Sequence, residues 1–553
     1  MLLPYYEKKS IHATRGNHSR SASATKKNRR DRLPPLVLVA RILGFIAAAT
    51  ILIRVFPAAP HVPNDPLGDD ALSNPIFHPP LAETIPVPLV NFPVVLAVID
   101  SPLVEATPPP IVDLPVVDPS DPSVAAHLAV DALYARQSKT LAQASARYSL
   151  RTKRAPPPNY DLWFHYAQER QCLIDDYDQI HRDFKPFYQL ADTHPAYFQE
   201  MIDRAHKLGF VEVRDGVAFS SGATNYFSAI LPDMSFLINS RDGPRVAFNF
   251  RAPSARKNAL LQTDPNPFHI APTGTSEFFA SQSGCILPTE ADGFMDNIND
   301  QHSFLIASTH PGYTTDLYPV LSMSKVSPCF ADILFPTEYY YERSWWSGKY
   351  GYPDNIPWDD KKPQLYWRGT STGGIVLGDN YHTFMRFKLA DMGRAHPDLM
   401  DVAITLVDPI GCREDLGCDA AALAVEYDIR EVAPAEKIYQ YKYAVDVDGE
   451  AFSGRFLGLL RSGSLVFKAT LFEEYFNDWL RPYEHYVPVK PDLSDLVQQL
   501  SWANENPEEA RLIQRRGQAV AQRVLTDEQN DCYFSAVLLE YARLQEYART
   551  LRV

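Results

Sequence analysis

A glycine-bearing turn followed by an arginine is the part of the sequence best suited to bind a diphosphate. The turn covers residues 448–454 (DGEAFSG), and Arg455 lies at the start of the segment GRFLGLLRSG, which is expected to be helical. The first N–H groups of a helix have no partner within it, so together with a guanidinium they can bind phosphate oxygens. Without a metal, such groups would also stabilise the charge developing on a phosphate leaving group. The alternative is that Arg455 is an ordinary charge on a helix surface.

A second arginine follows an apolar segment that is expected to be a strand. Residues 365–367 (LYW) precede Arg368-Gly369-Thr370. A strand that ends in this way can present backbone N–H groups and side-chain donors to a phosphate or a sugar. As a bare tripeptide it is also an ordinary turn. Arg386, within HTFMRFKLA, either reaches the same cleft or lies on a helix surface.

These residues must be positioned by alternating strands and helices. Strand-like apolar runs occur at 233–241, 402–409, 464–469 and 485–489. Between them lie helical segments, one of which ends on Gly463 and another of which begins with Asn506-Pro507 and two acidic residues. Alternation of this kind over nearly 400 residues predicts an α/β protein with parallel sheets.

The block YKYAVDVDGEAFSGRFLGLLRSGSLVFKATLFEEYFNDWLRPYEHYVPV, residues 441–489, resembles glycosyltransferase family 90. Further matching segments lie in order at 231–246, 366–374, 492–510 and 532–544, so the resemblance spans about 230–545. It implies a GT-B fold, in which two Rossmann-like lobes flank the site and the C-terminal lobe binds most of the nucleotide sugar. It also implies an inverting, metal-independent transfer from a UDP-sugar.

The resemblance assigns a role to one carboxylate. An acceptor hydroxyl needs a general base when it attacks the anomeric carbon, and Asp233 matches the family position expected to provide it. Two alternatives stay open. Asp233 can cap a turn before the strand, and the neighbouring Asp242 can serve instead, unless it forms a structural ion pair with Arg241.

The resemblance also gives a set of donor-binding residues, which consists of Arg368, Gly369, Thr370, Lys442, Asp448, Gly449, Ser453 and Arg455. Ser464 is a further candidate, although it also begins an expected strand.

Asp446 and Asp448 have the DxD spacing with which many sugar transferases hold a divalent metal. The pattern is common by chance, and here it lies within a block that resembles a metal-independent family. We therefore expect no metal ligands, no obligatory metal and no other cofactor.

The first 158 residues predict a membrane-tethered arrangement. Nine Lys/Arg residues lie before residue 33, and the following stretch, PLVLVARILGFIAAATILIRVF, is about as long as a bilayer core requires. The basic flank stays cytosolic by the positive-inside rule, which gives a single-pass type II topology with a lumenal C-terminal region. A cleaved signal peptide is the alternative. The expected segments are a basic tail (1–34), a transmembrane anchor (35–56), a proline-rich stem (57–123), a helical linker (124–158), an N-terminal acceptor-side lobe (159–345) and a C-terminal donor-binding lobe (346–553).

Charge and cysteine spacing restrict the other function classes. The formal net charge of −14 argues against a nucleic-acid surface, which would need a basic face. The cysteines have no CxxC spacing, so a zinc site is not expected. Cys412 and Cys418 bracket a short loop and can pair in an oxidising compartment; the alternative is that all six cysteines are buried thiols.

The sequence therefore predicts a Golgi or ER glycosyltransferase. It is expected to move xylose or glucose from a UDP-sugar to a hydroxyl of a glycan or glycoprotein acceptor. The alternative is a membrane-tethered, non-catalytic carbohydrate-binding protein built on a degenerate transferase fold. No GxSxG motif supports a third class, acyl transfer.

Overall fold

The structure is a computed structural model. It describes residues 122–196, 212–215, 227–232, 234–239, 242–246, 268–269, 313–314, 317–327, 330–342, 354–429 and 432–551. The predicted basic tail, the membrane anchor and nearly all of the stem lie outside these residues. Among the residues described, no helix combines the length and the apolar character that a membrane span requires.

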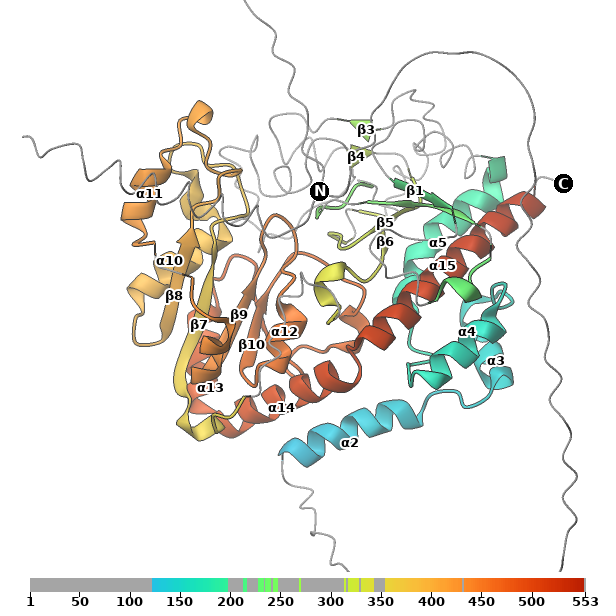
Figure 1. The fold of residues 1–553 in the computed structure, drawn as a ribbon, viewed down its shortest axis with the longest axis horizontal. Helices are drawn as coiled ribbons and strands as arrows, with labels where there is room; N and C mark the ends of the chain where they lie inside the picture. The colour runs from blue at the N-terminus through green and yellow to red at the C-terminus, as the bar shows by residue number, and fades with distance from the viewer. Residues whose placement is uncertain are drawn as a thin grey trace, which may run out of the picture. The chain divides into compact units, whose positions relative to one another are not determined.

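A five-stranded parallel sheet organises the C-terminal part of the chain (Figure 1). Its strand order is β11-β10-β9-β7-β8, and each neighbouring pair runs parallel. The strands are β7 (Lys362–Thr370), β8 (Met400–Leu406), β9 (Tyr441–Val447), β10 (Leu465–Ala469) and β11 (Val487–Val489). The helices between and after them are α10 (Met385–Ala395), α11 (Ala420–Glu426), α12 (Phe456–Arg461), α13 (Leu496–Glu505) and α14 (Pro507–Arg523).

The apolar runs that predicted strands of this sheet arise because these strands are buried. Every residue of β10 is buried, as a strand in the middle of a covered parallel sheet requires. The predicted strands at 402–409, 464–469 and 485–489 correspond to β8, β10 and β11. The predicted helix after Gly454 is α12, and Gly463 follows it with φ of 74°, a left-handed conformation that favours glycine.

A second, smaller sheet lies in the N-terminal part, in the order β1-β2-β5-β6. Strands β2, β5 and β6 run parallel, whereas β1 is antiparallel to β2. The predicted apolar run at 233–241 contains β2. The strands are β1 (Glu212–Asp215), β2 (Ser235–Ile238), β5 (Val320–Ser322) and β6 (Ile333–Leu334), and a separate antiparallel pair is formed by β3 (Phe268–His269) and β4 (Tyr313–Thr314).

Helices from both ends of the described chain pack together. The segment predicted as a linker forms α2 (Pro122–Ala135) and α3 (Leu141–Thr152), and α2 packs along α14. Helices α4 (Tyr160–Glu169) and α5 (Asp178–Thr193) pack against the last helix, α15 (Asp527–Thr550), as Figure 1 shows. The C-terminal helix therefore returns to the N-terminal part of the molecule.

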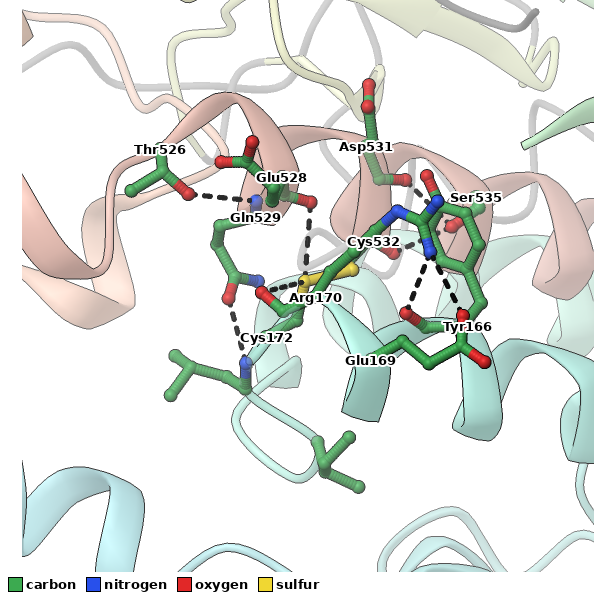
Figure 2. The surroundings of a disulfide bond; sticks show 12 residues. Tyr166, Glu169, Arg170, Cys172, Thr526, Glu528, Gln529, Asp531, Cys532 and Ser535 are labelled. Atoms are coloured by element: carbon green, nitrogen blue, oxygen red, sulfur yellow. Dashed lines mark hydrogen bonds and ion pairs between the residues drawn. A yellow bond between two sulfur atoms is a disulfide. The ribbon is translucent and has the colours of Figure 1, made fainter. Parts of the chain in front are cut away.

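Two disulfides are formed within the described residues. Cys412 pairs with Cys418, which is the first of the two alternatives left open by the sequence and contradicts the other, that all six cysteines are free thiols. Cys172 pairs with Cys532 across a sequence separation of 360, which the sequence did not predict. This bond joins the loop after α4 to α15 (Figure 2), where the side chain of Gln529 accepts a hydrogen bond from the backbone N–H of Leu173 at 2.8 Å.

The expected fold class is thus confirmed at the level of a parallel-sheet α/β protein. The five-stranded and the four-stranded sheets both contain parallel strands with helices packed on them, as in Rossmann-like folds.

Candidate active site

The predicted donor-binding residues gather mainly at one edge of the five-stranded sheet. Strand β7 ends at Thr370, β9 ends at Val447, and the turn 448–454 follows β9 directly. The carboxyl ends of parallel strands meet at the same edge, and ligands of open α/β sheets bind there. The sheet therefore brings the Arg368-Gly369-Thr370 segment and the 448–455 segment side by side.

Arg386, from the first turn of α10, holds these two segments together. Its Nε donates to the backbone oxygen of Asp448 at 2.9 Å, and its Nη1 donates to the backbone oxygen of Thr370 at 2.9 Å and to the hydroxyl of Thr372 at 2.5 Å. Burial and the neighbouring charge of Arg455 lower the pKa of Arg386 to about 9, so its guanidinium remains charged at neutral pH. Of the two positions considered from the sequence, the structure therefore places Arg386 at the cleft.

Arg368 is held mainly by the neighbouring strand. Its Nη2 lies 2.5 Å from Oδ1 of Asp401, and its Nη1 donates to the backbone oxygen of Asp401 at 2.7 Å. Although burial acts in the opposite direction, hydrogen bonds from Tyr441 and Arg368 lower the pKa of Asp401. Arg368 is consequently a paired residue beside the cleft, and its backbone oxygen accepts from Nη1 of Arg455 at 2.7 Å.

Arg455 lies between two cavities. It is the residue immediately before α12, and it lines both a cavity of about 560 Å³ and a neighbouring cavity of about 1060 Å³. The larger cavity is bordered by Arg368-Gly369-Thr370 and by the apolar residues 432–435. A guanidinium at the junction of two cavities can bind a charged group that joins two parts of one ligand.

The 560 Å³ cavity is lined by residues from both the C-terminal and the N-terminal parts of the chain. The C-terminal part contributes Thr372, Arg386 and residues 449–455, and the N-terminal part contributes Asp242 and Tyr339. Asp242, the alternative base considered from the sequence, therefore lines the same cavity as the two arginines.

Two carboxyl groups of the 448–454 turn have shifted pKa values. Burial raises the pKa of Asp448 to about 7, and Oδ2 of this residue accepts from the backbone N–H of Leu471 at 2.8 Å. Burial, followed by the charges of Asp408 and Asp242, raises the pKa of Glu450 to about 7. Glu450 lines the 560 Å³ cavity, where a carboxyl group of this kind can exchange hydrogen bonds with a ligand.

A buried lysine lies directly behind this turn. Nζ of Lys468 is 2.9 Å from Oδ2 of Asp446 and 3.6 Å from Oε2 of Glu474. Although burial alone lowers it, the charges of Asp446 and Glu474 raise the pKa of Lys468. The first aspartate of the DxD pattern thus has an ammonium as its partner, and the described residues contain no cluster of three metal-ligating side chains.

Two predicted residues lie at the opposite edge of the sheet. Lys442 is the second residue of β9, and its Nζ lies 5.6 Å from the centre of the Trp358 ring. It is separated from the end of β9 by about 16 Å of strand. Ser464 is buried directly before β10, and its hydroxyl donates to the backbone oxygen of Tyr441 at 2.9 Å. Of the two roles considered from the sequence, its position is the one at the start of a strand. Neither residue lines the two cavities.

Ser453 and Gly449 both line the 560 Å³ cavity. Ser453 is buried, and its backbone oxygen accepts from the hydroxyl of Tyr340 at 3.0 Å. A Cβ atom at Gly449 would lie only 2.7 Å from Nη2 of Arg386, so the absence of a side chain allows Arg386 to approach the turn. Asp233 and Arg241, the predicted base and its neighbour, lie outside the described residues.

Sequence reasoning missed Glu450, Lys468 and Glu474. Glu450 stood within the turn that was singled out, and its position between Gly449 and the arginine was the available signal. Lys468 and Glu474 gave no local signal, because their pairing with Asp446 depends on β9 and β10 lying side by side.

Comparison with known proteins gives a consistent result. Residues 350–552 match the model of Glycosyl transferase family 90, which confirms the resemblance over that part of the chain.

Three curated relatives are protein O-glucosyltransferases. The chain is 36% identical over 162 residues to Protein O-glucosyltransferase 3 of Homo sapiens, covering 29% of this chain and 30% of that protein. It is 30% identical over 189 residues to Protein O-glucosyltransferase 2 of Danio rerio, covering 34% of each. It is 29% identical over 265 residues to Protein O-glucosyltransferase 1 of Rattus norvegicus, covering 44% of this chain and 61% of that protein. The matched part thus spans only 30% of the first of these relatives.

Proposed function

We propose that this chain is a glycosyltransferase that moves xylose or glucose from a UDP-sugar to a hydroxyl of a protein or glycan. The observation that carries this proposal is the convergence of Arg386, Arg455 and the 448–454 turn on a cavity that residues of the N-terminal part also line. The family match over 350–552 and the protein O-glucosyltransferase relatives support it. The two sheets would then be the two lobes of a GT-B fold.

The two cavities suggest how the donor binds. We assign the uridine to the 1060 Å³ cavity, the diphosphate to Arg455 at the junction, and the sugar to the 560 Å³ cavity. Arg455 then stabilises the negative charge that develops on UDP as the bond to the sugar breaks. Arg386 fixes the two segments that surround the diphosphate, because it donates to backbone oxygens of both.

The proposed reaction is a single inverting displacement. The acceptor oxygen attacks the anomeric carbon from the side opposite UDP, the bond between that carbon and the phosphate oxygen breaks, and the acceptor proton passes to Asp233. UDP leaves with the electron pair. Asp233 holds this role in the proposal by its resemblance to the family position.

The reaction is proposed to need no metal. Lys468 already supplies a positive charge to Asp446, and Arg455 supplies one at the cavity. The expected membrane anchor and lumenal Golgi or ER location also remain part of the proposal, supported by the apolar segment 35–56 and its basic flank.

The test is to measure UDP release by the purified full chain with a panel of UDP-sugars and protein or glycan acceptors. We expect acceptor-dependent turnover with UDP-xylose or UDP-glucose that persists in EDTA. Asp233→Asn should reduce it by about 100-fold or more, as removal of a general base does. Background hydrolysis alone in both proteins would favour the non-catalytic carbohydrate-binding alternative. Abolition by EDTA with rescue by Mn²⁺ would contradict metal independence.

A further inference from the structure

A cavity of about 1050 Å³ is lined by α2 and shares no residue with the two cavities assigned to the donor. Helices α5 and α14 line it as well, together with the short 3₁₀ helix Asn477–Trp479 and residues between 481 and 485. We call it the α2 cavity. Its volume is comparable with the roughly 300–1,000 Å³ of pockets that hold small molecules.

Helix α2 is held in place as a wall of this cavity. Asp131 lies 2.7 Å from Nη2 of Arg523, the last residue of α14, and the hydroxyl of Tyr134 donates to the backbone oxygen of Arg523 at 2.8 Å. Val130 and Leu133, three positions apart on α2, line the cavity and give this wall an apolar surface.

Ion pairs neutralise most of the charged side chains that line the α2 cavity. Paired groups of this kind carry little net charge, but they can still exchange hydrogen bonds with the hydroxyl groups of a ligand. The pairs are Arg136–Asp176 at 3.1 Å, Arg182–Asp478 at 2.8 Å, Arg481–Glu484 at 3.4 Å, and Asp178 with Arg151 at 3.2 Å.

Arg516 of α14 is the exception. Its guanidinium forms no hydrogen bond or ion pair with the described residues, and its Nε is buried. Burial, aided by the charges of Arg481 and Arg516, lowers the pKa of His485 to about 4, so this imidazole is neutral. Its Nδ1 accepts from the backbone N–H of Arg481 at 2.9 Å, which leaves the proton on Nε2 as a further donor. The cavity therefore contains a positive charge that no described carboxylate neutralises.

One unmatched guanidinium fits a carboxylate better than a phosphate. A carboxylate carries a single charge and accepts two parallel hydrogen bonds from the guanidinium fork, whereas a phosphate monoester carries about −1.5 to −2 charges at neutral pH. Arg516 alone would offset only part of the larger charge.

The remaining walls favour a sugar over an alkyl chain as the body of the ligand. Nε1 of Trp479 donates to the backbone oxygen of Asp176 at 2.8 Å, so the polar edge of the indole is satisfied and its ring adds apolar surface. An alkyl chain would remove water from the ion pairs without hydrogen bonding to them, which is costly. A sugar ring has an apolar face for the Trp479 and α2 side and hydroxyl groups for the ion pairs.

We propose that the α2 cavity is a second carbohydrate site, which binds an acidic sugar through a bidentate contact between the sugar carboxylate and Arg516. The site goes beyond the proposed transfer, because none of its residues lines the donor cavities. Binding to it can be measured without turnover, so its outcome is independent of the outcome for the proposed function.

The experiment is a ligand-observed NMR titration of the purified full chain with methyl β-D-glucuronide, the neutral methyl β-D-glucoside and acetate. Arg516→Gln removes the charge, and Arg516→Lys keeps the charge without the planar fork. Ala129→Glu adds a carboxylate at an exposed position of α2 that lines the cavity. Arg511→Gln, on the same helix but outside the cavity, is the matched control. Thermal unfolding and UDP binding are measured for every variant.

We expect the wild type to bind the glucuronide at least about tenfold more tightly than the glucoside, the effect of a charge-assisted hydrogen-bonded pair. Arg516→Gln and Ala129→Glu should abolish this preference, and Arg516→Lys should keep part of it. Arg511→Gln should bind all three probes as the wild type does. UDP binding should be the same in every variant.

Several results would overturn the inference. Equal binding of glucuronide and glucoside by the wild type, or binding of neither, would exclude a site for acidic sugars. Acetate binding as tight as that of the glucuronide would show an anion site that does not recognise the sugar. A preference that survives in both Arg516→Gln and Ala129→Glu would place the binding elsewhere. If Arg516→Gln does not fold, Ala129→Glu decides alone, because its new side chain is not buried.

Discussion

A buried lysine pairs with an aspartate beside the four-stranded sheet, and another does so beside the five-stranded sheet. The two pairs differ in whether every carboxylate oxygen has a hydrogen-bond partner. In the N-terminal part, Asp183 bonds to Lys325, to Gln179 at 2.9 Å and to the backbone N–H of Leu334 at 2.9 Å. Both carboxylate oxygens are thus occupied. A pair of this kind maintains the packing of α5 against β5 and β6.

The C-terminal pair has more carboxylates than its lysine can match. Lys468 lies among Asp446, Asp448 and Glu474, and Oδ1 of Asp446 and Oε2 of Glu474 have no hydrogen bond among the described residues. Unmatched buried acceptors are costly, so they indicate a region shaped by something other than stability. The unbonded oxygens belong to residues beside the proposed donor turn, whereas the fully hydrogen-bonded pair joins α5 to the residues after β5.

The two pairs are connected through one backbone contact. The N–H of Lys325 donates to the oxygen of Glu473 at 3.0 Å, and the N–H of Glu473 donates to the oxygen of Lys325 at 2.7 Å. Glu473 directly precedes Glu474. These two backbone hydrogen bonds therefore connect the Asp183–Lys325 pair to the Asp446–Lys468 pair. Substitutions in each pair can show whether it serves stability or donor turnover.

The largest expected effect comes from removing each lysine. Lys325→Met and Lys468→Met should each lower the free energy of unfolding by about 3–5 kcal/mol, because a buried carboxylate loses its partner. At a temperature where both variants are folded, Lys325→Met should retain donor turnover and Lys468→Met should lose it. Urea denaturation and the UDP-release assay measure the two properties. Equal turnover by both variants would remove the functional distinction.

A slightly smaller loss is expected from opening the long-range disulfide. Cys172→Ser with Cys532→Ser should lower the free energy of unfolding by about 2–5 kcal/mol, since the bond closes a very long loop. Cys412→Ser with Cys418→Ser is the control and should lose less, because its loop is short. Thermal unfolding with and without reductant measures both. An equal loss in the two variants would contradict the loop-length argument.

An intermediate effect is expected at Gly449. A Cβ at this position would lie 2.7 Å from Nη2 of Arg386 and 3.1 Å from the hydroxyl oxygen of Thr372, so Gly449→Ala should displace the guanidinium. Overpacking of this kind costs about 1–3 kcal/mol. We expect it mainly as weaker UDP binding, measured by calorimetry. Gly417→Ala, in the Cys412–Cys418 loop, should leave UDP binding unchanged, and a loss there would mean that the effect is not local.

The smallest effect concerns pH. Because the folded-state pKa of Asp448 is raised to about 7, folding favours its protonated form. Its contribution to stability is full below its unfolded pKa of 3.8 and is lost as the pH rises through about 7. Asp448→Asn should therefore flatten the decline in the free energy of unfolding across this pH range. Urea denaturation at several pH values measures this, and identical pH profiles of the variant and wild type would contradict the assignment.

Much of the local structure followed from the sequence alone. The strands β8, β10 and β11 were predicted from apolar runs, and α14 begins at Pro507 as its proline and acidic residues indicated. The glycine-bearing turn before Arg455 and the pairing of Cys412 with Cys418 were also readable. These features depend on residues close together in the chain, where backbone geometry and side-chain periodicity act directly.

Other features depended on the tertiary arrangement. Arg368 is held by Asp401 because β7 and β8 are neighbours, and Lys468 meets Asp446 because β10 lies beside β9. Cys172 meets Cys532 because α15 returns to α4. The sequence determined which elements form and which residues carry charge. Only the order of strands and the packing of α15 decided which charges meet, since contacts between distant residues follow from the whole fold rather than from local spacing.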